Sequence, residues 1–146
     1  MRALFLLTMV AALTLGATSF ADEALPSGVK LKQIRIMSGA ASVLADAKGM
    51  TLYTFDKDQT PGKSSCNAKC AENWPPLAAP ADAKPVGNWT VVSRDDGSKQ
   101  WAFKGKPLYT FVQDISPAYY KGNGLPADKP MWHYVVPEGP MPDVAK

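Results

Sequence analysis

Short stretches of alternating apolar and polar residues run along much of the chain, and this period of two is typical of half-buried β-strands. The strongest hairpin pattern joins residues 89–94 to residues 99–103, where Asp96-Gly97 predicts a tight primed turn with positive φ angles. No long window carries the 3.6-residue apolar period of a helix, although residues 67–73 can form one or two helical turns. Further strands are predicted at 29–36, 42–46, 50–55, 108–111 and 131–136, with a bulge at Gln33 where the alternation slips by one residue. The pattern therefore predicts an all-β fold with little helix.

One short segment, which we call the repeated phrase, occurs twice in the chain. Residues 48–58 and residues 104–114 match at seven of eleven positions without a gap. The interval between matching residues, as from Tyr53 to Tyr109, is therefore constant, and we call it the repeat spacing. This density of identity predicts two copies of one supersecondary unit. Because an isolated hairpin is only marginally stable in water, we expect the two tandem hairpin-rich repeats to share one aromatic core.

Each copy of the phrase carries a tyrosine, a phenylalanine two residues later and an aspartate three residues after that. On a strand, the tyrosine and the phenylalanine point to the same face. The aspartate follows the strand end, where its carboxylate can accept backbone N–H bonds or reach a tyrosine hydroxyl. We therefore interpret the repeated motif as a structural staple rather than a ligand site. Its members are Tyr53, Phe55 and Asp58 in the first copy and Tyr109, Phe111 and Asp114 in the second.

The N-terminal sequence predicts export from the cytoplasm. Residues 1–21 have the pattern of a signal peptide, in which Arg2 precedes an apolar run and a small-residue cleavage site ends at Ala21. Cleavage there leaves an expected N-terminal segment with one strand (22–41), a single β domain (42–136) and a C-terminal tail (137–146). Within the domain, the predicted repeats span 42–77 and 88–136. A proline-rich segment joins them. Since proline is excluded from central strands, we expect this segment to be an extended crossing.

Charge and cysteine content narrow the function further. Of the 16 lysines and arginines, 15 remain without Arg2 and face 13 acidic residues with no basic stripe, so nucleic-acid binding is not expected. Cys66 and Cys70 are the two cysteines of the chain, and in an exported protein they predict a local disulfide. Since the first cysteine lies far beyond the cleavage site, no lipid anchor is expected. We expect a periplasmic or secreted protein without a cofactor.

These features resemble a family of secreted repeats described as predicted bacterial lipoproteins with a Tyr-x-(Phe/Trp/Tyr)-x-x-Asp motif. Both copies of the motif match, as do residues 46–53, the two cysteines followed by Trp74-Pro75-Pro76-Leu77, and residues 96–101. The resemblance spans roughly residues 42–136. It implies an exported domain of tandem repeats whose biochemical role is not established, and it implies no catalytic residue. The chain departs from the family's name in having no lipidation cysteine after the predicted cleavage site.

A metal or redox protein is the alternative that the sequence leaves open. Met131 and His133, the single histidine of the chain, are candidate soft-metal ligands, and Cys66 and Cys70 are further sulfur donors. The cysteines are separated by three residues, whereas typical zinc and thiol-redox motifs have two. No hydrolase motif is present. Four tryptophans could stack on sugars, but most fall at strand positions and are interpreted as core: Trp74, Trp89, Trp101 and Trp132.

The sequence therefore favours an exported, soluble, non-enzymatic binding or interaction module. Its expected partner is an envelope protein or a cell-wall component. The alternative is a periplasmic copper or thiol redox protein that uses the cysteines, Met131 and His133.

Overall fold

The computed structural model describes residues 24–137. The predicted signal peptide, its cleavage near Ala21 and residues 138–146 of the predicted tail lie outside this range. None of the helical structure between residues 24 and 137 has the length and hydrophobicity of a membrane-spanning segment. The regular structure is almost entirely antiparallel strand, so the predicted all-β fold with little helix is confirmed. The elements are β1 (Val29–Ile36), β2 (Gly39–Asp46), β3 (Tyr53–Phe55), α1 (Lys69–Asn73), β4 (Trp89–Ser93), β5 (Lys99–Phe103), β6 (Lys106–Pro107) and β7 (Trp132–Tyr134).

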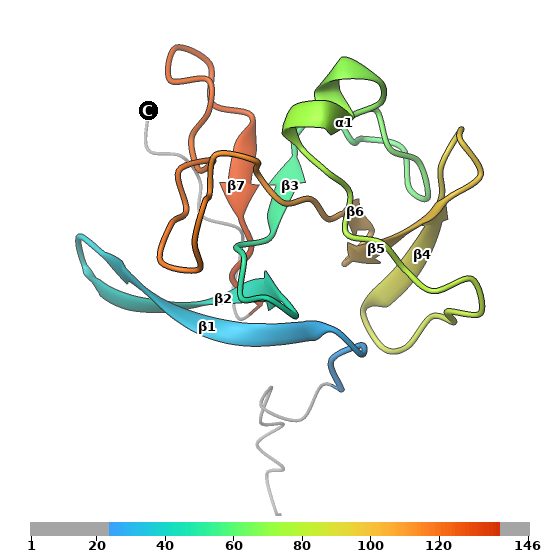
Figure 1. Ribbon diagram of the computed structural model, residues 1–146, viewed down its shortest axis with the longest axis horizontal. Coiled ribbons are helices and arrows are strands. Elements are labelled where there is room, and N and C mark those ends of the chain that lie inside the picture. The colour runs from blue at the N-terminus through green and yellow to red at the C-terminus, as the bar shows by residue number, and fades with distance from the viewer. Residues whose placement is uncertain (1–23, 138–146) are drawn as a thin grey trace, which may run out of the picture.

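A long hairpin of β1 and β2 lies along one side of the molecule (Figure 1). Its register runs without a break from Val29 opposite Asp46 to Ile36 opposite Gly39, so the predicted bulge at Gln33 is wrong. The slip in the alternation arises because the hairpin buries Val29 on one face and Ile34 on the other. A two-stranded ribbon can bury different faces along its length because it twists strongly.

The predicted hairpin of β4 and β5 is present, and β6 adds a third strand to it. Gly97 has a positive φ of 83° but Asp96 does not, so the primed turn predicted here is wrong. The Gly97 N–H instead donates to the Arg94 carbonyl, as in a three-residue loop that ends in a left-handed glycine. Two successive positive φ angles occur at Lys104 and Gly105, between β5 and β6.

The two copies of the repeat are interlocked through their backbones. Tyr53 of β3 and Tyr109 exchange both of their backbone hydrogen bonds, at 2.8 and 3.0 Å. On its other side β3 pairs with β7, which comes from the end of the second copy (Figure 1). Residues 108–111, predicted as a strand, form only isolated bridges at Tyr109, and we call this segment the second motif strand. The end of the first copy bonds to it in return, where Leu77 N–H donates to the Leu108 carbonyl at 2.8 Å. Each motif strand is therefore flanked by the terminal segment of the opposite copy.

Equivalent bonds in the two halves indicate an approximate two-fold relation between the copies. Asp56 N–H donates to the Met131 carbonyl at 2.9 Å, and Val112 N–H donates to the Asn73 carbonyl at 3.1 Å. The two donors occupy matching positions of the repeated phrase, and each acceptor directly precedes a tryptophan. The approximate axis passes between the two motif tyrosines, where the central backbone bonds are exchanged.

The motif strands contribute side chains to two buried clusters, because alternate residues point to opposite faces. The aromatic cluster consists of Tyr53, Phe55, Cys66, Trp74, Tyr109, Phe111 and Trp132. The second cluster consists of Val29, Leu44, Leu52, Trp89, Trp101, Phe103, Leu108 and Val135. Both copies supply residues to both clusters, so the prediction that the repeats share an aromatic core is confirmed.

Removal of one ring from the aromatic cluster should destabilise both copies together. We expect Trp74→Ala to lower the free energy of unfolding by about 3–5 kcal/mol, the usual cost of deleting a buried tryptophan. Urea denaturation followed by far-UV circular dichroism measures this loss. Ile115→Ala is the control, because Ile115 is 77% exposed, and it should cost less than about 0.5 kcal/mol. Two separate unfolding transitions in Trp74→Ala would contradict a shared core.

Candidate functional site

Each motif tyrosine donates its hydroxyl to the motif aspartate of the other copy. The Tyr53 hydroxyl lies 2.5 Å from Asp114 Oδ2, and the Tyr109 hydroxyl lies 2.6 Å from Asp58 Oδ2. Both tyrosines are fully buried and both aspartates are 3% exposed. A carboxylate this deep in a protein is stable only when donors surround it. Each copy therefore supplies a hydrogen bond that the carboxylate of the other copy requires.

The second oxygen of each carboxylate fixes the loop that follows its own strand. Asp58 Oδ1 accepts bonds from the Ser65 N–H and hydroxyl, both at 2.6 Å. Asp114 Oδ1 accepts a bond from the Lys121 N–H at 2.7 Å. Ser65 and Lys121 are counterparts at the repeat spacing, so the two loops are equivalent. Each aspartate thus joins a loop of its own copy to the tyrosine of the other.

Burial raises the pKa of Tyr53 and of Tyr109 above the ordinary phenol value. The hydrogen bond to a carboxylate raises it further, since a phenolate beside Asp114 or Asp58 would place two negative charges together. Both tyrosines are therefore hydrogen-bond donors at neutral pH and do not act as bases. These contacts support a structural role for the repeated motif.

Four rings from the two copies form a continuous stack at the centre of the aromatic cluster. Trp74 and Trp132 lie parallel, with centroids 3.7 Å apart and an angle of 2°. Phe55 stacks on the outer face of Trp132 and Phe111 on the outer face of Trp74, each at 4.2 Å. The order of the rings alternates between the first and the second copy. Stacked aromatic pairs add about 0.5–1.5 kcal/mol each beyond the area that they bury, so the stack is a second link between the copies.

The predicted disulfide between Cys66 and Cys70 is present, with Cα atoms 5.1 Å apart. It closes a short loop in which Ala68 adopts a positive φ of 48°. The Cys66 carbonyl accepts a bond from the Arg94 guanidinium at 2.8 Å, and the Asn67 side chain accepts another at 3.1 Å. The disulfide therefore holds a set of acceptors around a buried cation.

Arg94 is connected to the motif through two hydroxyl groups. Its guanidinium donates to the Ser64 hydroxyl at 2.9 Å, and Ser64 in turn lies 2.7 Å from the Tyr109 hydroxyl, which bonds Asp58. Arg94 is 7% exposed. A buried charge is costly unless hydrogen bonds compensate it, and in a chain of such bonds each polarises the next. The cation and the carboxylate are thus joined without direct contact.

The second copy has a glycine in place of the buried cysteine. Gly122 is the counterpart of Cys66 at the repeat spacing, and a Cβ atom there would come within 2.7 Å of the Trp74 ring. The Gly122 N–H donates to the Tyr53 hydroxyl at 3.3 Å. A positive charge near Asp114 comes from Lys32 of β1, whose pKa is lowered by burial while the charge of Asp114 acts in the opposite direction. The two copies therefore stabilise equivalent carboxylates by different means.

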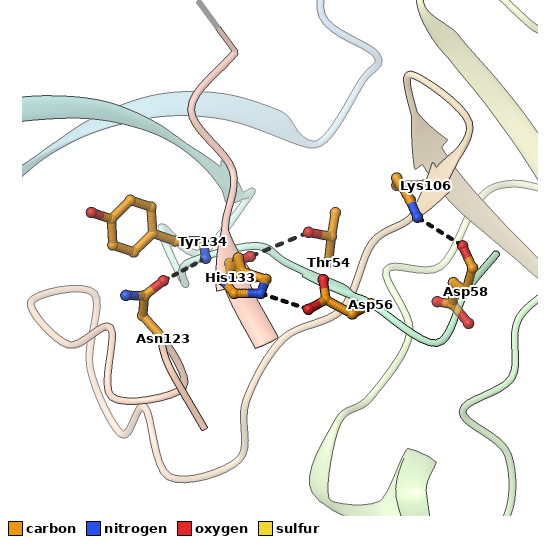
Figure 2. A network of polar contacts seen from close by, with 7 residues as sticks. All are labelled: Thr54, Asp56, Asp58, Lys106, Asn123, His133 and Tyr134. Atoms are coloured by element: carbon orange, nitrogen blue, oxygen red, sulfur yellow. Dashed lines mark hydrogen bonds and ion pairs between the residues drawn. The ribbon is translucent and has the colours of Figure 1, made fainter. Parts of the chain in front are cut away.

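The predicted metal candidates lie on β7 and the residue before it. Figure 2 shows His133 facing Asp56, with Nε2 and Oδ2 3.0 Å apart. The Thr54 hydroxyl donates to the His133 carbonyl at 3.5 Å and not to the ring (Figure 2). Met131 packs against the aromatic cluster. Across residues 24–137 no three His, Cys, Asp or Glu side chains gather as a metal site requires. A copper or redox role for these residues stays a prediction.

A shallow hollow of about 290 Å³ opens beside the ring stack. We call it the aromatic groove, and it is lined by Trp74, Phe111, Trp132, Leu125, Pro126, Asn73 and Gln113. Both faces of Trp74 are covered by other rings, so its edge lines the groove. Asn73 and Gln113 are exposed and add amide groups to this apolar lining. Apolar walls with a few polar groups are typical of sites that bind an apolar ligand in a fixed orientation.

Several residues of the site could not be identified from the repeated phrase alone. At the repeat spacing the counterpart of Trp74 is Pro130, so a search at that spacing does not pair Trp74 with Trp132. Arg94 and Ser64 have no counterparts in the matching segments. The glycine at 122 is the one further signal, because it aligns with the buried Cys66.

Comparison with known proteins agrees with this division into two copies. A family model described as a secreted repeat of unknown function matches residues 38–78 and residues 90–136. Together the two matches cover more than half of the chain. No curated protein and no solved structure matches it. The family resemblance inferred from the sequence is therefore confirmed.

A double-mutant cycle can test the exchange of partners between copies. Tyr53→Phe removes the donor and Asp114→Ala removes the acceptor of the same buried bond, so we expect a coupling energy of about 1–3 kcal/mol in the free energy of urea unfolding. Asp58→Ala is the matched control, because Asp58 belongs to the copy of Tyr53 but bonds Tyr109. Its effect and that of Tyr53→Phe should add within about 0.5 kcal/mol. Stronger coupling of Tyr53 to Asp58 than to Asp114 would show that the exchange is absent.

The raised pKa values of Tyr53 and Tyr109 predict a loss of stability at alkaline pH. In the unfolded chain a tyrosine ionises near pH 10, whereas the folded state retains both phenol protons above that pH. Below about pH 10, the two tyrosines should therefore make their full contribution to the free energy of unfolding. Above that pH, each tyrosine should lower the free energy of unfolding by about 1.4 kcal/mol per pH unit. Urea unfolding between about pH 10 and 11.5 measures this slope. Tyr109→Phe should have a shallower slope than the wild type, and equal slopes would contradict the assignment.

Proposed function

Because the chain belongs to a family of secreted repeats of unknown function, we propose that it is a non-enzymatic binding module that acts outside the cytoplasm. We infer that its aromatic groove receives an apolar side chain of an envelope protein. The observation that carries this proposal is the groove itself, an apolar hollow of about 290 Å³ with two exposed amide side chains in its lining.

The interlocked core supports a binding role for the groove. The rings of Trp74 and Trp132 are held by stacking on both faces, so a ligand would meet walls that are already in place. A preformed site loses little conformational entropy when it binds. By contrast, the hydroxyls and carboxylates of the repeated motif bond to one another and are buried, so they offer a ligand little access.

The shape of the groove favours a peptide side chain over a sugar. Sugar rings stack on exposed aromatic faces, but both faces of Trp74 and of Trp132 are occupied by neighbouring rings. Ring edges, Leu125 and Pro126 instead form walls that suit a bulky apolar group. The amides of Asn73 and Gln113 can bond to the backbone on either side of such a group. Of the two partner classes that the sequence suggests, an envelope protein therefore suits the groove better than a cell-wall glycan.

Peptides selected on the wild-type protein, and then measured on a variant with a blocked groove, can test this proposal. Gln113→Trp places a large ring at the side of the groove. Lys57→Trp introduces the same ring at the equivalent exposed position of the first copy. Peptides selected from a random phage-displayed library on the wild-type protein should contain a bulky apolar residue. Calorimetry should show at least about tenfold weaker binding of these peptides to Gln113→Trp, or about 1.4 kcal/mol, and unchanged binding to Lys57→Trp. Unchanged binding to Gln113→Trp, or no enrichment on the wild type, would contradict the proposal.

A further inference from the structure

We propose that the outer edge of β1 binds a second ligand, an extended acidic segment of another exported protein, by adding it as a strand to the β1–β2 hairpin. This edge is separate from the aromatic groove, whose lining contains no residue of β1. Figure 1 shows the long hairpin at the side of the molecule.

The hydrogen bonds of β2 show which backbone groups of β1 point away from the sheet. Leu44 lies opposite Leu31, but its N–H bonds the Val135 carbonyl and its carbonyl bonds the Leu52 N–H. Leu44 therefore has no backbone bond to spare for Leu31. Because bonded and non-bonded pairs alternate in an antiparallel hairpin, Gln33 also directs its N–H and carbonyl outward.

Most of this outward edge is available within the part of the chain that the structure describes. Between residues 24 and 137, no backbone group outside the hairpin bonds the N–H or the carbonyl of Leu31 or of Gln33. Val29 N–H bonds the Pro26 carbonyl, which closes the start of the strand. The Arg35 carbonyl accepts the Tyr120 hydroxyl at 2.5 Å, which covers one group near the other end. The open stretch between these two ends is long enough for a short added strand.

The charge on this edge selects an acidic partner. β1 carries three cations and no acidic residue. Lys30 and Arg35 are exposed on opposite faces of the hairpin, whereas the Lys32 amine bonds the Pro117 carbonyl at 2.7 Å. Opposite charges across neighbouring strands are stabilising and like charges are not. Cations on an edge strand also oppose pairing with an identical strand, so a second copy of the chain is a poor occupant.

The spacing of the exposed residues on β1 predicts the sequence pattern of the ligand. An antiparallel segment that places acidic residues opposite Arg35 and Lys30 must carry them five positions apart. The residue beside the second acid then lies opposite Leu31, which is 47% exposed, and should be apolar. The peptide Glu-Val-Thr-Val-Leu-Glu meets these conditions. Lys-Val-Thr-Val-Leu-Lys keeps its strand propensity and reverses its charge.

Amide hydrogen exchange followed by NMR tests the proposal on the mature protein. Without peptide, the amides of Leu31 and Gln33 should exchange rapidly, while the inward amides of Lys32 and Ile34 exchange slowly. Saturation with the acidic peptide should slow exchange at Leu31 and Gln33 at least tenfold, and the basic peptide should leave it unchanged. Slow exchange at Leu31 and Gln33 before any peptide is added would overturn the proposal, since another segment or a second copy would already cover the edge. Equal protection by both peptides would overturn it as well.

Two variants distinguish a loss of binding at the β1 edge from a general loss of folding. Gln33→Pro removes an outward N–H without removing a bond to β2, so it should abolish peptide binding, whereas Gln33→Ala should retain it. Arg35→Glu leaves every backbone group in place and should weaken binding of the acidic peptide at least fivefold. Undiminished binding to either Gln33→Pro or Arg35→Glu would show that the peptide binds elsewhere.

Discussion

The buried carboxylates of Asp58 and Asp114 impose the constraint on which the rest of the structure depends. A carboxylate enclosed in an aromatic core must be surrounded by hydrogen-bond donors, and here one of these donors is a tyrosine of the opposite copy. Neither copy can bury its own aspartate in this way without the other. The tandem repeat is therefore not two small domains in sequence but one core formed by two half-complete units.

The exchanged strands and the ring stack follow from the same arrangement. Once the two tyrosines meet at the approximate axis, the terminal segment of each copy lies beside the motif strand of the other. These segments bring Trp74 and Trp132 face to face at 3.7 Å, with a phenylalanine of the motif on each side. The groove and the β1 edge, where we propose binding, lie outside the exchanged hydrogen bonds at the approximate axis.

Local patterns and the repeat could be predicted from the sequence, because strand alternation and identity at a fixed spacing are properties of short segments. Residue identity alone does not show whether Tyr53 bonds the aspartate of its own copy or that of the other. The bulge at Gln33 was a wrong prediction because burial on two faces of a twisted ribbon imitates an inserted residue. The pairing of Trp74 with Trp132 lay outside the repeated phrase, where the second copy no longer keeps the repeat spacing. Arg94 could not be placed, since Gln100 is its one partner nearby in the sequence and the others come from the distant loop around Cys66.

Complementation between fragments tests the interlocking of the two copies most directly. Residues 24–87 and residues 88–137 would be prepared as separate chains, and near-UV circular dichroism would be recorded as one is titrated with the other. Because each copy completes the core of the other, neither fragment alone should give a fixed aromatic signal, and the mixture should give a native signal that saturates at a ratio of one to one. A native-like signal with cooperative melting from either fragment alone would show that the copies fold independently, and would contradict the shared core.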